Sequence, residues 1–201
     1  SNPQRQGEQK KPLAPHEVRL IRGILEAEKN LRDLALFNTA IDTMLRASDL
    51  LQLTVGDVVE SDGATIKRDF NLSQIKTRLP VAVTLTLICQ DSLLRWIIES
   101  GKQFQPWRYL FTGFRRNTLQ NPISTTQYRR LVKKWITEAR LEPAYYSTHS
   151  LRRTKASLIF QATGNHEIVR QLLGHSSIES TSHYLGVERK HALEVARKIK
   201  I

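Results

Sequence analysis

The sequence predicts a mainly α-helical domain with a small three-stranded antiparallel sheet, that is, an α+β fold. Apolar residues recur at helical spacing over both ends of the chain, whereas part of the stretch 57–87 alternates between apolar and smaller or polar residues. A chain of 201 residues can bury one sizeable core, but two full domains would be cramped. We therefore expect one domain over residues 13–201, preceded by an arm of residues 1–12.

The first twelve residues, "SNPQRQGEQKKP", are polar, contain glycine and proline, and lack an initiator methionine. This composition is typical of a flexible N-terminal arm or of the remnant of a tag. Two helices are then expected, separated by a break around Asn30. Their apolar positions are Val18, Ile21 and Leu25 in the first helix, and Leu34, Phe37, Ile41 and Leu45 in the second.

The central stretch changes from helical to alternating spacing. "SDG" at 61–63 indicates a turn, and Val81, Val83, Leu85 and Leu87 alternate with smaller or polar residues, which predicts the sheet. "DSLLRWIIESG" then predicts a helix from residue 91 that stops at Gly101, a typical position for a left-handed C-terminal cap. The segment 102–123 contains glycine, asparagine and two prolines, and we expect a long loop there.

Helices return in the last third of the chain. Ser124 followed by Gln127 is a capping-box start for a helix over 125–141. One face of this helix is apolar and suits a core, while the basic residues on the other face could contact phosphates. Further helices are expected at about 149–162, 166–173, 178–185 and 188–199. The apolar face of the helix at 125–141 consists of Tyr128, Leu131, Trp135 and Ile136.

The chain carries a formal net charge of +12 that is spread along its length, so we expect a polyanionic partner. No apolar run approaches the roughly 20 residues that a membrane helix needs. Cys89 has no second cysteine to pair with, and no histidine or carboxylate spacing resembles a zinc site. These features favour a reducing compartment inside the cell, and we expect a cytoplasmic protein without a membrane partner.

The stretch "THSLRRTKAS" at 148–157 contains a histidine and two arginines that could form part of a catalytic site. On a helix, His149 and Arg152 share a face because they are three residues apart, whereas Arg153 points about 100 degrees further round. A guanidinium binds two phosphate oxygens at once, and an imidazole can hold or pass a proton near neutral pH. The pair suits phosphoryl transfer, although a helix cap and a surface charge would explain the same two residues.

Three other stretches complete a pattern. "MLRASDLLQL" carries Arg46, "QIKTRLPVAV" carries Lys76 between two expected strands, and "LLGHSSIESTSHYLGV" carries His175 and Tyr184. In their order and local spacing, these stretches and the histidine–arginine box resemble the tyrosine recombinase, or phage integrase, family. The resemblance runs from about residue 13 to the C-terminus and implies the catalytic-domain fold of that family.

The resemblance also implies an activity. In that family a tyrosine attacks a DNA phosphodiester, forms a 3′-phosphotyrosyl bond and releases a 5′-hydroxyl, and a second DNA end then reverses the step. No metal or nucleotide cofactor is needed. The implied partners are double-stranded DNA with specific recombination sites and a homotetramer on that DNA, formed from a chain that is monomeric when free. The matching residues are Arg46, Lys76, His149, Arg152, His175 and Tyr184.

The residue types suit these roles. Two arginines would stabilise the charge that builds on the non-bridging oxygens during attack. The ammonium of Lys76 would protonate the leaving 5′-oxygen as a general acid. A nearby imidazole would accept the proton of the phenol. Arg46 and Arg152 are the expected arginine clamp, His149 is the expected base, and His175 is expected to donate to a phosphate oxygen.

Each assignment has an alternative. Arg46 could pair with Asp49 as a structural arginine, and Tyr184 could be a core residue. Several other residues compete for the roles or are interpreted as surface residues. Lys67, Arg68 and Arg78 compete with Lys76, Tyr145 and Tyr146 are rival nucleophiles, and His16, His166, His183 and His191 are interpreted as surface residues.

The chain departs from the family pattern in a few places. Asp49 stands where the family usually has glutamate, and Met44 replaces a frequent glycine. No separate core-binding domain is visible ahead of Leu13, so we expect either a catalytic fragment or a protein similar to the single-domain fimbrial switch invertases. The C-terminal segment 188–201 could pack on its own domain, or dock into a neighbouring protomer as in relatives, which is the arrangement we expect.

Two other functions remain open. Residues 166–185 have the helix, glycine-containing turn and helix of a helix-turn-helix, which suits a DNA-binding regulator without catalysis. A type IB topoisomerase would use closely similar chemistry to relax supercoils without site preference. The sequence favours a recombinase of a mobile genetic element, encoded by a bacterium or phage and associated with the nucleoid, and leaves integration, excision and inversion open.

Overall fold

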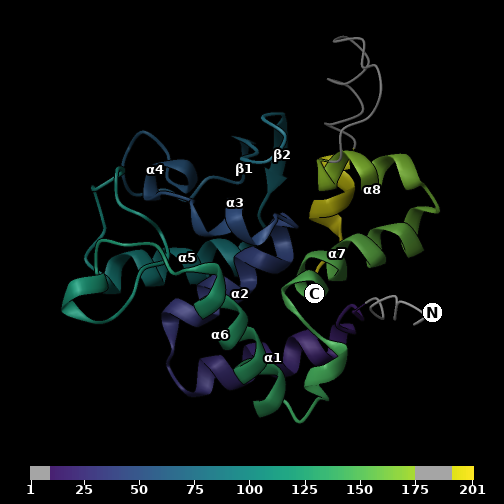
Figure 1. Ribbon diagram of the computed structural model, residues 1–201. Helices are drawn as coiled ribbons and strands as arrows, with labels where there is room; N and C mark the ends of the chain where they lie inside the picture. Colours follow the sequence, from purple (N-terminus) through teal and green to yellow (C-terminus); the bar gives the residue numbers. More distant parts are fainter. Residues whose placement is uncertain (1–9, 175–191) are drawn as a thin grey trace, which may run out of the picture.

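The computed structural model describes residues 10–174 and 192–201, and it confirms the predicted fold class. Helices dominate the described residues, and one small antiparallel sheet lies at the edge (Figure 1). No described helix is long and apolar enough to span a membrane. The long helices are α1 (Pro15–Ala27), α2 (Leu31–Thr43), α5 (Leu87–Glu99), α6 (Thr125–Glu138), α7 (Thr148–Thr163) and α8 (His166–Leu173). The short elements are α3 (Ala47–Leu51), α4 (Val55–Val58), the strands β1 (Asp69–Ser73) and β2 (Pro80–Thr84), and single 3-10 turns at Arg116–Thr118 and Pro143–Tyr145.

Helix α2 is the centre of the molecule. It is buried along nearly its whole length, and it packs against α5, α7 and α1 (Figure 1). A fully buried helix must satisfy its polar side chains internally. The amide of Asn38 donates to the hydroxyl of Ser92 in α5, and the carboxylate of Asp42 pairs with Lys155 in α7. These contacts fix α2 between the two helices that flank it.

Helix α6 follows the sequence prediction closely. The hydroxyl of Ser124 accepts from the backbone N–H of Gln127, so the predicted N-terminal cap is confirmed. The four predicted apolar residues of α6 are buried. Among them, the indole of Trp135 donates to the carboxylate of Asp33 and packs edge-on against Phe37 of α2. The basic side chains of α6 lie on the opposite, exposed face.

The sheet has two strands rather than the predicted three. β1 and β2 pair antiparallel, with Phe70 opposite Val83. Where a third strand was expected, the described residues contain a single antiparallel bridge between Val59 and Ile66. The ladder does not extend away from the turn because α4 occupies Val55–Val58, immediately before Val59.

The prediction for the start of α5 was also wrong. The alternating pattern was extended to Leu87, but the helix begins at that residue, whose side chain is 70% exposed. Both the backbone N–H and the hydroxyl of Thr86 donate to the carboxylate of Asp42, at 2.7 Å each. A side chain from α2 therefore caps α5, and this contact turns the chain out of the strand.

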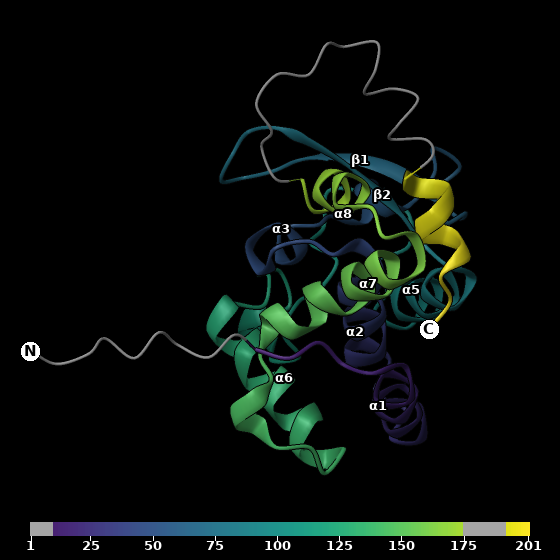
Figure 2. The ribbon, with the colours of Figure 1, turned by 90° about the vertical axis from the view of Figure 1, so that its right-hand side faces the viewer.

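The C-terminal part forms a second, smaller core. Residues 192–198 are helical, within the expected 188–199, and lie next to α7 and α8 (Figure 2). In this single chain the helix packs on its own domain, which was the alternative to docking into a neighbour. The short helix expected at 178–185 lies outside the described residues. Residues buried in this second core are Met44, Ala156, Ile159, Ile168, Leu172, Ala192 and Ala196.

Candidate active site around two arginines

Arg46 follows directly from the end of α2. The helix stops at Met44, which adopts the left-handed conformation with φ of 54°, and Arg46 then begins α3 as its N-cap residue. The side chain of Arg46 is half-buried. Its Nη1 donates to Oε1 of Gln74 at 2.6 Å. The left-handed turn therefore directs the first candidate arginine toward the hairpin.

Arg152 comes from the first half of α7 and forms hydrogen bonds with the C-terminal ends of two other helices, α2 and α8. Its Nε donates to the carbonyl of Met44 at 2.9 Å, and its Nη2 donates to the carbonyl of Leu173 at the end of α8, at 2.8 Å. Burial, and then the positive charge of Arg46, lower the pKa of Arg152 to about 10, against the opposing effect of Asp49. Gln74, which accepts from Arg46, also donates to the carbonyl of Gly174, the residue after Leu173. The two arginines therefore meet at the C-terminal end of α8.

The turn that carries Lys76 lies against the same site. Lys76 is exposed on the connection between β1 and β2, as the sequence predicted. The backbone N–H of Ile75 donates to the buried carboxylate of Asp49 at 2.8 Å. No ion pair joins Asp49 to Arg46 in the described parts of the chain. Asp49 thus anchors the turn that carries Lys76. The ion pair between Arg46 and Asp49, which was the alternative role of Arg46, is not observed.

His149 lies one helical turn before Arg152 in α7 and is exposed. The hydroxyl of Ser147 caps this helix and accepts from the backbone N–H of His149. His175 and Tyr184 lie outside the described residues. The structure thus brings together Arg46, Arg152 and the Lys76 turn, with His149 on the helix that supplies the second arginine.

The rival tyrosines lie on the connection between α6 and α7. The ring of Tyr145 contacts the ammonium of Lys11 at 4.5 Å from its centroid. The hydroxyl of Tyr146 donates to the carboxylate of Glu17, and burial together with that carboxylate raises the pKa of Tyr146. A raised pKa makes a phenol harder to deprotonate, so Tyr146 is poorly suited to be a nucleophile.

Gln74 was not predicted as a site residue. Its side chain is only 2% exposed and contacts Arg46, although it stands just two residues before Lys76. A glutamine next to a predicted turn is usually solvated. The only available signal was its place at the end of an alternating strand, and this does not reveal a partner from another segment.

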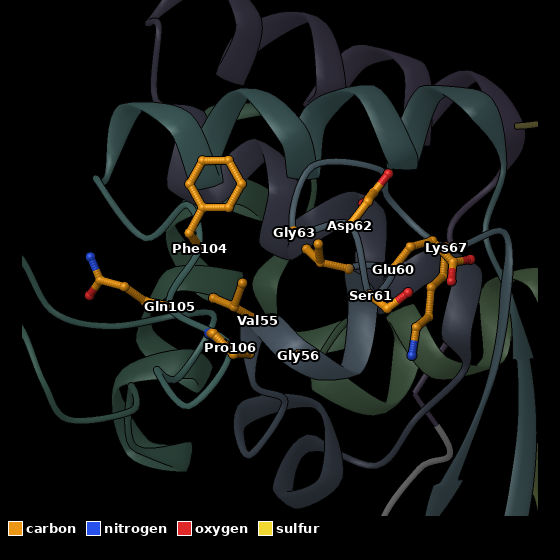
Figure 3. Close-up of a pocket in the computed structure, with 11 residues that line it drawn as sticks. Val55, Gly56, Glu60, Ser61, Asp62, Gly63, Lys67, Phe104, Gln105 and Pro106 are labelled. Atoms are coloured by element: carbon orange, nitrogen blue, oxygen red, sulfur yellow. The ribbon is translucent and has the colours of Figure 1, made fainter.

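A separate cavity of about 450 Å³ lies between α4 and the loop that follows α5 (Figure 3). Val55 and Pro106 line its apolar part, and Glu60 and Lys67 stand at its polar side. Arg46, Lys76, His149 and Arg152 do not line this cavity, although Lys67, the rival of Lys76, does. It is therefore distinct from the arginine site.

Solved structures identify the fold of the chain. The chain matches a structure of XerA recombinase with a TM-score of 0.67 and 19% identity, over 95% of this chain and 66% of that one. It also matches the catalytic core of lambda integrase with a TM-score of 0.61 and 19% identity, over 85% and 94% of the two chains. The fold is thus that of tyrosine recombinase catalytic domains.

Residues 11–191 match the Phage integrase family, and the chain belongs to that family. It is 31% identical over 160 residues to "Probable integrase/recombinase YoeC" of Bacillus subtilis (strain 168), covering 80% of each chain. It is 28% identical over 191 residues to tyrosine recombinase XerA of Pyrococcus horikoshii, covering 95% of this chain. The chain spans 62% of that XerA and 44% of a XerC from Caldanaerobacter subterraneus.

Proposed function

We propose that this chain is the catalytic domain of a site-specific DNA recombinase, which cleaves and rejoins strands through a 3′-phosphotyrosyl intermediate. The observation that carries this proposal is the proximity of Arg46 and Arg152, which come from segments about a hundred residues apart. Two guanidinium groups that lie at one place can bind the two non-bridging oxygens of one phosphate. A phosphodiester is therefore the ligand that suits this pair.

The roles of the residues follow from the chemistry of phosphoryl transfer. Arg46 and Arg152 bind the non-bridging oxygens and stabilise their charge in the transition state. Lys76, exposed on the turn beside the pair, protonates the leaving 5′-oxygen. His149 accepts the proton of Tyr184 as its phenol attacks, and His175 donates to a phosphate oxygen. The energy of the broken bond is kept in the phosphotyrosyl linkage, so the reaction needs no nucleotide cofactor.

The proposal includes the partners. One similar structure, at 20% identity and a TM-score of 0.65, is that of XerH site-specific recombinase bound to its difH substrate. By analogy, we propose that this chain acts on double-stranded DNA with specific sites, as a tetramer on DNA and a monomer when free. The net charge of +12 supports a polyanionic partner. We also propose a cytoplasmic location, in association with the nucleoid.

The experiment that tests the proposal is a search for a covalent adduct. Nicked duplexes from the DNA that flanks the gene are incubated with wild type and with Tyr184→Phe, and the products are separated on a denaturing gel. We expect an adduct with wild type only. Tight binding without an adduct from either protein would instead favour a DNA-binding regulator, and relaxation of arbitrary plasmids at high turnover would favour a topoisomerase.

A further inference from the structure

Gln74 connects three segments that are far apart in the sequence. It follows β1 directly, is buried, and lies at the start of the turn that carries Lys76. Its Oε1 accepts from Nη1 of Arg46 at 2.6 Å. Its Nε2 donates to the carbonyl of Gly174 at 2.9 Å and to the carbonyl of Leu79 at 3.3 Å. One side chain therefore joins the first arginine, the hairpin and the end of α8.

The chemistry of the three partners requires an amide at this position. The guanidinium of Arg46 can only donate, and the carbonyls of Leu79 and Gly174 can only accept. Only one orientation of the Gln74 amide satisfies all three groups. A glutamate would place a negative oxygen against two carbonyl oxygens, and a methionine would leave buried polar groups unpaired. The geometry of these three partners thus favours glutamine at position 74.

Gly174 is matched to this contact. It ends α8 in the left-handed conformation with φ of 66°, and it directly precedes His175 in the sequence. A Cβ atom on Gly174 would lie 2.7 Å from Nε2 of Gln74. The close approach therefore depends on the absence of a side chain at position 174.

We infer that Gln74 is a positioning residue of the active site, which fixes the guanidinium of Arg46 for the scissile phosphate. In the described parts of the chain, Gln74 provides the side-chain hydrogen bond of Arg46. An arginine has five N–H groups in a rigid fork, so one bond to Gln74 orients the group and leaves others for phosphate oxygens. The inference rests on the proposed function, because it concerns the arginine clamp of that reaction.

The test compares two DNA substrates. On an ordinary phosphodiester, Gln74→Met should slow adduct formation by about 10- to 100-fold, because the arginine loses its alignment. DNA affinity should stay within about threefold, since phosphate contacts elsewhere dominate binding. A methylphosphonate at the scissile position carries no charged non-bridging oxygen. On this substrate the defects of Gln74→Met and Arg46→Ala should both shrink, whereas that of Lys76→Ala should persist because the leaving group is unchanged.

Matched variants separate this role from general stability. Gln90→Met removes another glutamine amide, one that donates to the carbonyl of Ile66, and should leave both rates unchanged. Gln74→Ser is a second variant that adds no bulk if the methionine is not tolerated. In an Arg46→Ala background, Gln74→Met should change the rate by less than about threefold, because it acts through that arginine.

Two results would overturn the inference. One is an adduct rate close to wild type in Gln74→Met and Gln74→Ser, and the other is an equal defect of these variants on both substrates. Failure of the wild type itself to form an adduct on either substrate would contradict the proposed function instead. The two failures are therefore distinguishable.

Discussion

At the scale of single residues, a buried ion pair near the arginine site holds together the helices that carry it. Lys155 is fully buried in α7, one helical turn after Arg152, and its Nζ lies 3.1 Å from the carboxylate of Asp42 in α2. The other carboxylate oxygen of Asp42 accepts both bonds from Thr86. This carboxylate therefore holds α2, α7 and the start of α5 in one arrangement.

Breaking this pair should be costly. Lys155→Met should lower the free energy of unfolding by about 3–5 kcal/mol, because it leaves a buried carboxylate without its counter-charge. Adding Asp42→Asn should recover part of that loss. Denaturant unfolding of the two single variants and the double variant measures both effects. A loss below about 1 kcal/mol for Lys155→Met would show that the pair contributes no more than an exposed ion pair does.

Lys102 should make stability depend on pH. It is almost completely buried and donates to the carbonyl of Leu110 and to the hydroxyl of Thr112. Burial, and then the charges of Arg108 and Arg32, lower its pKa to about 7, from 10.5 in the unfolded chain. Between these two values the unfolded chain holds a proton that the folded protein has lost, so stability rises with pH across this window.

The size of this effect can be measured by difference. From pH 7 to pH 9 the wild type should gain about 2 kcal/mol relative to Lys102→Met, whose side chain does not titrate. Chemical unfolding at both pH values gives the four free energies that are needed. An equal pH response of the two proteins would show that Lys102 keeps an ordinary pKa.

At the scale of elements, the helix ends position the site. α2 and α8 both end in left-handed residues, and carbonyls at or near these ends accept hydrogen bonds from Nε and Nη2 of Arg152. Gly164 provides a comparison, because it ends α7 with φ of 62° but no described residue outside its own stretch of chain has an atom within 4 Å of its Cβ position. The two glycines share a backbone conformation and differ in their surroundings.

This difference gives a matched pair of variants. Gly164→Ala should cost about 1 kcal/mol from the left-handed backbone alone and leave adduct formation unchanged. Gly174→Ala should add a collision with Gln74, and should therefore also slow adduct formation. Thermal unfolding and the adduct assay measure the two effects separately. Equal behaviour of the two variants in both assays would contradict a tight contact between Gly174 and Gln74.

Much of the element pattern could be predicted from local sequence. The helix at His166–Leu173 and the core face of α6 follow from apolar spacing and capping residues. The start of α5 could not, because a carboxylate 44 residues earlier in the chain caps it. The role of Gln74 could not be predicted for the same reason, since its partners Arg46 and Gly174 lie 28 and 100 residues away in the sequence. Contacts between distant segments leave no local periodicity.

At the scale of the whole molecule, charge should govern DNA binding. The exposed face of α6 includes Arg130 and Lys133, which contribute to the net charge of +12. If both side chains contact phosphates, replacing each with glutamine should reduce the slope of log affinity against log salt by about 0.9. Arg95→Gln is the control, because Arg95 pairs with Glu26 on another helix. Fluorescence anisotropy over a salt series measures the slopes, and unchanged slopes for the α6 variants would exclude this face from the interface.

The central claim is that the arginine pair serves a covalent reaction at Tyr184. The most direct measurement is mass spectrometry of the protein–DNA adduct after nuclease and protease digestion, which identifies the modified residue and the linked end of the DNA. The proposed function predicts a single nucleotide attached through its 3′-phosphate to Tyr184. Attachment to Tyr145 or Tyr146, or a 5′-phosphate linkage, would contradict it.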